Sequence, residues 1–208
     1  QKNELIRKVD KFLNEEKWYN SRGIPYTFGI LLYGDPGCGK TSFIKALLKY
    51  IDKMRKKRIH GVQVNLNDSF DLDALQNLIT KDRIGEWNIP LDQKLFIFED
   101  IDCMGDIVKD RDKLDEKNKA TDEFLKKLDK DQNVSSSVTI NQCINGLINE
   151  KKNSLSKLLN ILDGITETPG RIIVATTNKI GALDSALIRP GRFDIIINFR
   201  KCSVNMLT

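Results

Sequence analysis

A glycine-rich stretch, GDPGCGKT over Gly34–Thr41, carries the residue types that bind a chain of phosphates. It matches the pattern G-x-x-x-x-G-K-[ST] in full, and it lies between an apolar run and an amphipathic one. Glycines let successive backbone N–H groups face one anion, and the start of the following helix adds positive potential. The alternative, a turn that merely starts a helix, has little support because the order strand, turn, helix is the one phosphate binding requires.

Two side chains of this stretch supply most of the chemistry. Lys40 can reach the β- and γ-phosphates as a point charge, and the Thr41 hydroxyl can bind Mg²⁺. We therefore expect ATP and Mg²⁺ as the ligands. Cys38 fills a variable position with no histidine near it in sequence, so we do not expect a nucleophile. The predicted nucleotide-binding residues are Gly34, Asp35, Pro36, Gly37, Cys38, Gly39, Lys40, Thr41 and Ser42.

Adjacent carboxylates end a later apolar run, LFIFED over 95–100. Because side chains alternate faces along a strand, we expect Glu99 and Asp100 to leave the strand end in different directions. One would then address the metal and the other the attacking water, which makes Thr41, Glu99 and Asp100 the predicted metal ligands. A helix-terminal charge or a solvated loop is the alternative, but the apolar residues before the pair place it at the mouth of the core. Asp102 is expected to be a loop or helix-capping acid.

Apolar runs alternate with helical patterns along the chain, and this order predicts a parallel sheet covered on both faces. The predicted fold is an α/β three-layer P-loop NTPase with a five-stranded parallel sheet. The segment SRGIPY, with Gly23 and Pro25, is expected to end the first helix. Ser69 and Ser154 are predicted to begin helices, and Gly164 to end one. Strands are predicted at 27–34, 60–66, 94–100, 171–178 and 194–199, and helices at 4–13, 41–54, 69–79 and 154–165.

Composition limits the class of protein. The chain has 208 residues, of which 40% are hydrophobic and 30% charged, as in a soluble globular domain. No apolar run approaches the roughly 20 residues that span a bilayer, and the N-terminus does not resemble a signal peptide. Four scattered cysteines indicate reduced thiols, hence a reducing intracellular compartment. One histidine makes histidine-based catalysis or zinc binding unexpected.

Two polar segments each allow two interpretations. The basic run KMRKKR over 53–58, within a net charge of +5, could touch nucleic acid or anionic lipid. A solvated last helical turn is the preferred interpretation, since no aromatic residues interleave the cations. Residues 104–153 break the α/β pattern and are predicted to be a surface insertion, with a partner-binding arm as the alternative. The predicted organisation is a helix and linker leading into the nucleotide pocket at 1–26, and an ATPase large subdomain at 27–208.

In their order and spacing, GILLYGDPGCGKTSFIKAL, LFIFEDID, VATTN and ALIRPGRFD resemble AAA-type ATPases. KWYNSRGIPYTFGILLYG and LSKLLNILDGI resemble, more narrowly, the mitochondrial members that assemble respiratory complex III by translocating the folded Rieske iron–sulfur protein. The resemblance implies that Asn178 is the sensor of the γ-phosphate and that Arg189 and Arg192 are arginine fingers for a neighbouring subunit. The alternative for the two arginines is a local, solvated turn.

The resemblance also bears on the acidic pair, because this mitochondrial subfamily carries Glu before Asp. Position in the motif then assigns Glu99 to the metal and Asp100 to the water, whereas residue type would assign them the other way round. The resemblance further implies a homo-oligomeric ring and a protein client, and it places the segment 23–25 against the adenine. Phe70, in the segment that corresponds to a pore loop, is expected either to grip a polypeptide or to lie in the core.

We expect the helical lid of AAA modules to be absent from this chain, and membrane attachment to require segments outside it. A mitochondrial inner-membrane location follows from the resemblance alone. The predicted function is Mg²⁺-dependent ATP hydrolysis that drives protein translocation, remodelling or chaperone-type assembly. Two alternatives stay open: an AAA ATPase acting on nucleic acid, of the clamp-loader or replication type, and a nucleotide-regulated scaffold with little turnover.

Overall fold

The computed structural model describes residues 2–64, 71–103, 155–163 and 168–201. Its helices are α1 (Lys2–Asn14), α2 (Glu16–Ser21), α3 (Lys40–Arg55) and α4 (Leu72–Thr80), with a further helix over residues 155–163. The main strands are β1 (Thr27–Gly34), β2 (His60–Gln63), β5 (Lys94–Phe98), β6 (Arg171–Thr177) and β7 (Ile195–Phe199), and β3 (Arg83–Ile84) and β4 (Trp87–Asn88) form a small hairpin. Short 3₁₀ turns are η1 (Leu91–Gln93), η2 (Ile101–Cys103) and η4 (Ile180–Ala182).

The main sheet has five strands in the order β2-β5-β6-β1-β7, and every pairing is parallel. The predicted α/β fold with a five-stranded parallel sheet is therefore confirmed. β1 lies between β6 and β7, so the glycine-rich stretch that follows it leaves from the interior of the sheet. In a parallel sheet all strand ends of one kind share an edge, and here Gly34, Phe98 and Thr177 all end their strands at the same edge.

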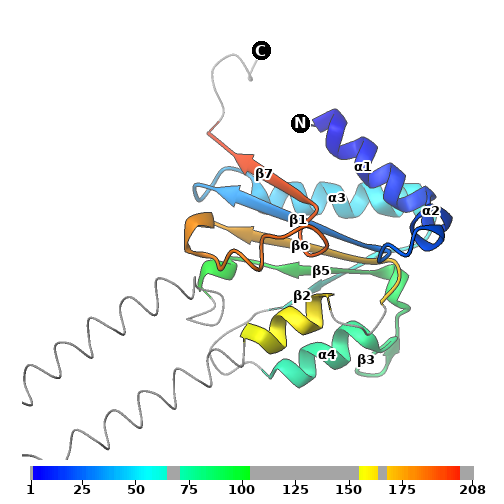
Figure 1. Ribbon diagram of the computed structural model, residues 1–208. Coiled ribbons are helices and arrows are strands. Elements are labelled where there is room, and N and C mark those ends of the chain that lie inside the picture. Colours follow the sequence, from blue (N-terminus) through cyan, green and yellow to red (C-terminus); the bar gives the residue numbers. More distant parts are fainter. Residues whose placement is uncertain (1, 65–70, 104–154, 164–167, 202–208) are drawn as a thin grey trace, which may run out of the picture.

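Strand residues alternate between two apolar layers, one on each face of the sheet. Ile30 and Leu95 pack with α1 and α3, whereas their neighbours Leu31 and Phe96 pack with α4 and the helix over 155–163. All four side chains are fully buried. Figure 1 shows the resulting three layers, with α1 and α3 on one face of the sheet and α4 and helix 155–163 on the other. Burial on both faces explains why the strands are continuous apolar runs rather than alternating ones.

The N-terminal region differs from the prediction of one helix followed by a linker. α1 ends at Asn14, and a second helix, α2, begins at Glu16, with Glu15 outside helical geometry at φ −116° and ψ 38°. The change of direction brings Tyr19 edge-on to Phe12, with ring centroids 5.9 Å apart. Phe12 also stacks on Phe28 of β1 at 5.1 Å, so an aromatic cluster fixes the two helices against the start of the sheet.

Smaller differences concern helix starts and short strands. α4 begins at Leu72 and is capped by Asp71, whose carboxylate accepts a hydrogen bond from the Asp73 N–H at 2.8 Å. Ser69, the predicted start, precedes this cap and lies outside the described residues. The β3–β4 hairpin was not predicted, because strands of two residues are too short to carry a period.

Several predictions fall outside the described residues. These are the insertion at 104–153, the helix boundaries at Ser154 and Gly164, the role of Phe70, and any lid after 201. Among the helices that the structure describes, none combines the length and apolarity that crossing a bilayer requires.

Candidate nucleotide site

The glycine-rich loop turns directly out of β1 because its glycines allow backbone angles that other residues avoid. Gly34 has a φ of +146°, and a Cβ at this position would lie 2.0 Å from the carbonyl oxygen of Phe199 on β7. Gly39, at the start of α3, has a φ of +91°. No side chain in the described part of the chain caps α3, so the N–H groups of its first turn point out of the helix without a side-chain acceptor. This is the geometry of an anion-binding helix start.

Lys40, the first residue of α3, points back over the loop and is only 7% exposed. Its ammonium group donates to the carbonyl oxygens of Gly34 at 2.7 Å and Asp35 at 3.1 Å. The third donor meets the side-chain oxygen of Asn178 at 2.7 Å. A lysine has three N–H donors, and all three are used here. Lys40 is thus held at the loop, and one of its contacts reaches the end of β6.

Glu99 follows β5 and lies beside the loop. One carboxylate oxygen accepts from the Thr41 hydroxyl at 3.0 Å, and the other accepts from the side-chain amide of Gln63 at 2.9 Å. Gln63 ends β2, the neighbour of β5 in the sheet. Thr41 and Glu99 are therefore adjacent oxygen donors, and Gln63 orients the carboxylate.

Asp100 diverges from Glu99 because the backbone turns sharply between them. Asp100 has a φ of +48°, in the left-handed region that favours glycine, asparagine and aspartate. Its N–H donates to the Thr176 hydroxyl at 2.9 Å, and its carboxylate accepts from the Asn178 amide at 3.2 Å. The two acids do leave in different directions. The cause is this left-handed turn rather than strand alternation, since β5 already ends at Phe98.

Asp102 was predicted to be a loop or capping acid, and the structure gives its carboxylate a different set of partners. One oxygen accepts from the Thr177 hydroxyl at 2.8 Å and from the Asn178 backbone N–H at 3.1 Å. Asp102 lies in the 3₁₀ turn η2, directly after the acidic pair, yet it binds the end of β6.

The oxygen donors at this edge fit Mg²⁺. This ion prefers hard oxygen ligands and commonly binds one or two carboxylates while substrate phosphates and water complete its shell. Glu99 supplies one carboxylate and Thr41 a hydroxyl, and their oxygens lie 3.0 Å apart. Within the described residues, no group of three or more His, Cys, Asp or Glu side chains could hold a metal by itself. Two protein oxygen donors fit an ion whose remaining ligands are phosphate and water oxygens.

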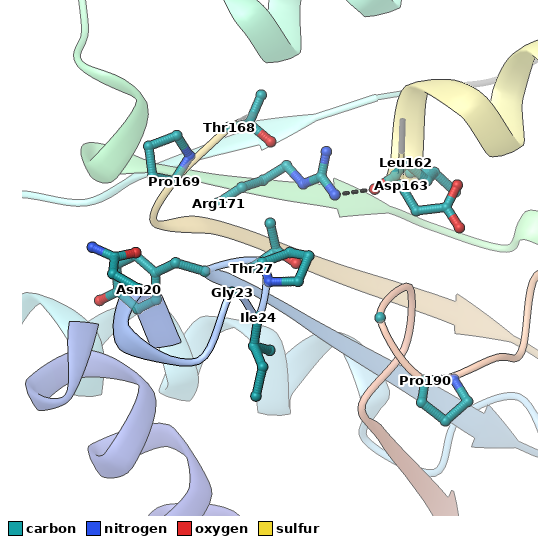
Figure 2. A pocket seen from close by; sticks show the side chains of 13 residues that line it. Asn20, Gly23, Ile24, Thr27, Leu162, Asp163, Thr168, Pro169, Arg171 and Pro190 are labelled. Atoms are coloured by element: carbon teal, nitrogen blue, oxygen red, sulfur yellow. Dashed lines mark hydrogen bonds between the residues drawn. The ribbon is translucent and has the colours of Figure 1, made fainter. Parts of the chain in front are cut away.

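The opposite edge of the sheet holds a cavity of about 840 Å³ between the start of β1 and the loop before β7 (Figure 2). Its lining includes Gly23, Ile24 and Pro25, the segment expected to contact adenine. β1 runs eight residues from this edge to the phosphate loop, about 23 Å at the usual strand rise. The structure thus does not bring this segment to the phosphate loop.

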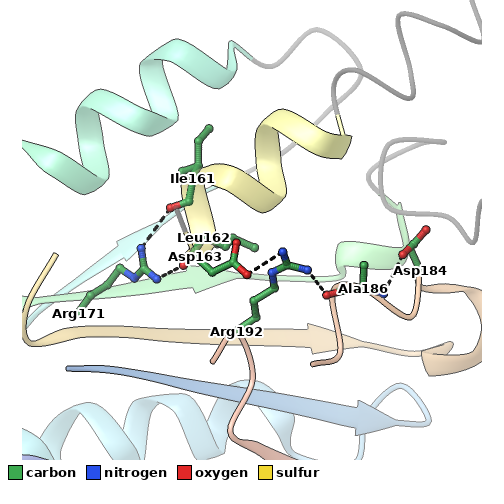
Figure 3. Close-up of polar contacts among 7 residues, drawn as sticks. All are labelled: Ile161, Leu162, Asp163, Arg171, Asp184, Ala186 and Arg192. Atoms are coloured by element: carbon green, nitrogen blue, oxygen red, sulfur yellow. Dashed lines mark hydrogen bonds and ion pairs between the residues drawn. The ribbon is translucent and has the colours of Figure 1, made fainter. Parts of the chain in front are cut away.

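Two arginines at this far edge bind the C-terminal end of helix 155–163 (Figure 3). Arg171 is 4% exposed and donates to the carbonyl oxygens of Ile161, at 3.2 Å, and Leu162. Burial lowers the pKa of Arg171 to about 10, against the opposing effect of Asp163, so the side chain stays charged at neutral pH. Cations at a helix C-terminus also complement the helix dipole.

Of the two predicted arginine fingers, only Arg189 is exposed. The side chain of Arg192 is 12% exposed and pairs with the Asp163 carboxylate at 2.7 Å. A second N–H of Arg192 donates to the carbonyl oxygen of Ala186. Arg192 is therefore occupied within its own chain, and Arg189 lies on the surface of the same loop.

Sequence reasoning missed Gln63 and Arg171, and it did not anticipate the contacts of Asp102. Gln63 gave no signal of its own, because it lies inside the predicted strand 60–66, between two valines. Arg171 opens an apolar strand, which is a weak signal. For Asp102 no local signal exists, because its partners lie 75 residues away in sequence.

Comparison with known proteins identifies the family of this chain. The profile of the ATPase family associated with various cellular activities (AAA) matches residues 30–201. The chain is 35% identical to the human protein named mitochondrial chaperone BCS1, over 98% of this chain and 39% of the human one. A probable mitochondrial chaperone BCS1-B of Dictyostelium discoideum is 35% identical over 96% of this chain and 39% of its own. The corresponding fission yeast protein is 33% identical over 90% of this chain and 31% of its own.

The chain thus spans about two fifths of the length of the first two relatives and about a third of the fission yeast protein. The matched part contains the phosphate loop, the acidic pair and Asn178. The predicted resemblance to AAA-type ATPases is confirmed, and mitochondrial chaperones are among the relatives. From the family match and the site geometry together, the chain belongs to the AAA family of ATPases.

Proposed function

We propose that this protein binds ATP with Mg²⁺ and hydrolyses it to drive chaperone-type work on a protein client. The observation that carries the proposal is the convergence of Lys40, Thr41, Glu99, Asp100 and Asn178 at one edge of the sheet, linked by hydrogen bonds of 2.7–3.2 Å. Three chain segments contribute these groups, so the convergence depends on the fold. Each group has a distinct task in phosphoryl transfer.

The phosphate loop and Lys40 hold the phosphate chain. Because all three Lys40 donors are used, a γ-phosphate must replace at least one acceptor. The Asn178 oxygen is the acceptor that moves most easily, since it belongs to a side chain on another strand and the other two belong to the loop itself. Phosphate binding would thereby release the Asn178 amide to contact phosphate and water.

The two acids divide the remaining tasks by their partners. Glu99 shares a hydrogen bond with Thr41, which supports a place on the metal side. Asp100 contacts the sensor amide of Asn178, which supports a place beside the attacking water, where it would accept the water's proton. Mg²⁺, when bound, would neutralise charge on the β- and γ-phosphates. This assignment, with Glu99 at the metal and Asp100 at the water, follows position in the motif rather than residue type.

A ring with a neighbouring copy would complete the site, and Arg189 is the residue we assign to reach the neighbour's nucleotide. Its side chain is exposed, while its loop is anchored by Asp194, which accepts from the Gly29 N–H at 2.9 Å and the Gly191 N–H at 3.2 Å. An exposed arginine on a fixed loop suits a contact made in trans. Such an arginine contributes about 10³- to 10⁵-fold in rate.

A protein client in a mitochondrion is supported by relatives named mitochondrial chaperones. Action on nucleic acid has less support, because two cations of the basic run are engaged within the chain. Arg55 donates to the Asp92 carbonyl oxygen, and Lys57 pairs with the Asp92 carboxylate at 3.2 Å. We therefore do not retain the nucleic-acid alternative.

The test of this function is Lys40→Ala in the complete protein. Loss of a charged donor to the phosphates should weaken ATP binding by at least about 10²-fold, or about 2.7 kcal/mol. Isothermal titration with ATP and Mg²⁺ gives the affinity. Lys45→Ala is the matched control, because Lys45 is an exposed lysine on the same helix. Equal ATP affinity for Lys40→Ala and the unmodified protein would refute the site.

A further inference from the structure

The acidic turn and the end of β6 are tied together by a set of hydrogen bonds that phosphate binding does not use. The hydroxyl of Thr176, 2% exposed, receives the Asp100 N–H. The hydroxyl of Thr177, fully buried, donates to Asp102. Asp102 also receives the Asn178 N–H. Two neighbouring threonines of one strand thus clamp alternate residues of the turn that follows the adjacent strand.

These bonds fix the backbone on both sides of the reacting groups. Thr177 further accepts the Lys179 N–H at 3.0 Å, so the hydroxyl that binds Asp102 also fixes the residue after Asn178. The Asn178 side chain, between Lys40 and Asp100, is thereby left as the part of this segment that is free to change partners. Among the described residues, the Asp102 carboxylate contacts the end of β6 and not the phosphate loop.

The geometry points to Asp102 as a positioning residue for ATP hydrolysis, which holds the Asn178 main chain so that its amide faces Asp100 and the γ-phosphate. The inference rests on the proposed function. It gives the third acid of EDID a task distinct from metal binding and from water activation. It also assigns to Thr177 the supporting contact that keeps the carboxylate in place.

A positioning role makes a specific kinetic prediction. Without Asp102, Lys40 and the loop can still bind ATP, but the Asn178 amide is no longer held at the water. For Asp102→Ala we expect kcat to fall about 10- to 100-fold, the range for misplacing a reacting group by about 1 Å. KM for ATP should change less than about threefold, because the ground-state phosphate contacts remain.

Asp102→Asn is the conservative variant. The Thr177 hydroxyl and the Asn178 N–H both donate to the same carboxylate oxygen, and an amide oxygen in its place can accept both. We expect Asp102→Asn to keep kcat within about threefold of the unmodified protein. Cys103→Ala is the matched control, since Cys103 lies in the same turn with an exposed side chain. It should leave kcat unchanged.

The experiment measures steady-state ATP hydrolysis by the complete protein, together with thermal unfolding and amide hydrogen exchange of the peptide that contains Asn178. A fall in kcat at constant KM, with faster exchange at Asn178 and rescue by Asp102→Asn, is the expected result. An unchanged kcat in Asp102→Ala overturns the inference. So does a fall in kcat that only follows a fall in unfolding temperature and is not rescued.

The outcome also separates this inference from the proposed function. If the unmodified protein turns over ATP and Asp102→Ala turns over equally well, only the positioning role is refuted. If the unmodified protein neither binds nor hydrolyses ATP, the proposed function fails, and the positioning role fails with it.

Discussion

Both edges of the main sheet gather charged side chains, but they hold them in different ways. The phosphate edge is formed by the carboxyl ends of the strands and carries the glycine-rich loop. There, Glu99 and Asp100 contact the side chains of Thr41, Gln63 and Asn178. At the far edge, Arg171 contacts main-chain carbonyl oxygens at the end of a helix (Figure 3). Side-chain partners rotate away with little cost, whereas helix carbonyls do not move without the helix.

The difference separates groups that can change partners from groups that cannot. At the phosphate edge the side-chain contacts of Lys40, Glu99 and Asp100 can be exchanged for a phosphate, a metal ion or water. At the far edge the guanidinium of Arg171 satisfies carbonyls that α-helical geometry leaves without partners. We therefore expect the charged side chains to support catalysis at one edge and stability at the other. Variants at the two edges should show opposite patterns of lost activity and lost stability.

The largest effect is expected at the phosphate edge, from Asp100→Asn. An asparagine cannot take the proton of the attacking water, so kcat should fall about 10³-fold, or about 4 kcal/mol, while ATP still binds. Single-turnover assays with labelled ATP would detect nucleotide that is bound and not cleaved. The unfolding temperature should stay unchanged, since Asp100 is exposed.

Glu99→Gln is the matched variant for that prediction, and it should weaken the dependence of ATP binding on Mg²⁺. If Glu99→Gln instead traps ATP and Asp100→Asn loses Mg²⁺, the two acids act according to residue type. The assignment from the Thr41 and Asn178 contacts would then be wrong.

The phosphate edge was the more predictable of the two for a physical reason. The glycine-rich loop and the acidic pair are each made of residues that are neighbours in sequence. Each follows an apolar run that predicts a buried strand. Their convergence follows from parallel strands ending at one edge. Position 178 needed the family resemblance. The contacts of Asp102 and Arg171 depend on which strands and helices are neighbours in space, and periodicity does not encode that.

The far edge was less predictable because its arginines have two plausible environments. A turn such as Pro190–Gly191 predicts exposure of the residues beside it, and this holds for Arg189. Arg192, three residues on, turns instead toward Asp163. Only the position of helix 155–163 against the sheet distinguishes the two, and that position is a tertiary property.

A smaller but distinct effect is expected from Arg171→Ala at the far edge. The change leaves the Ile161 and Leu162 carbonyls without their donor, and it opens a gap beside a buried helix end. We expect a loss of about 3 kcal/mol in the free energy of unfolding. Urea unfolding measures it. If ATP affinity falls tenfold or more while stability is unchanged, the division between the two edges is wrong.

The smallest effect is expected from Arg192→Ala, which tests whether Arg192 has a structural or a catalytic role. Arg192 belongs to the far edge by its contacts but to the catalytic group by family resemblance. If its contacts with Asp163 and Ala186 define its role, stability should fall by about 1–2 kcal/mol, because the pair is only partly buried. Arg189→Ala, at an exposed position of the same loop, is the control and should leave the unfolding midpoint unchanged. If Arg192→Ala keeps full stability and abolishes turnover, its pairing with Asp163 is a resting contact, and the far edge also holds a group that changes partners.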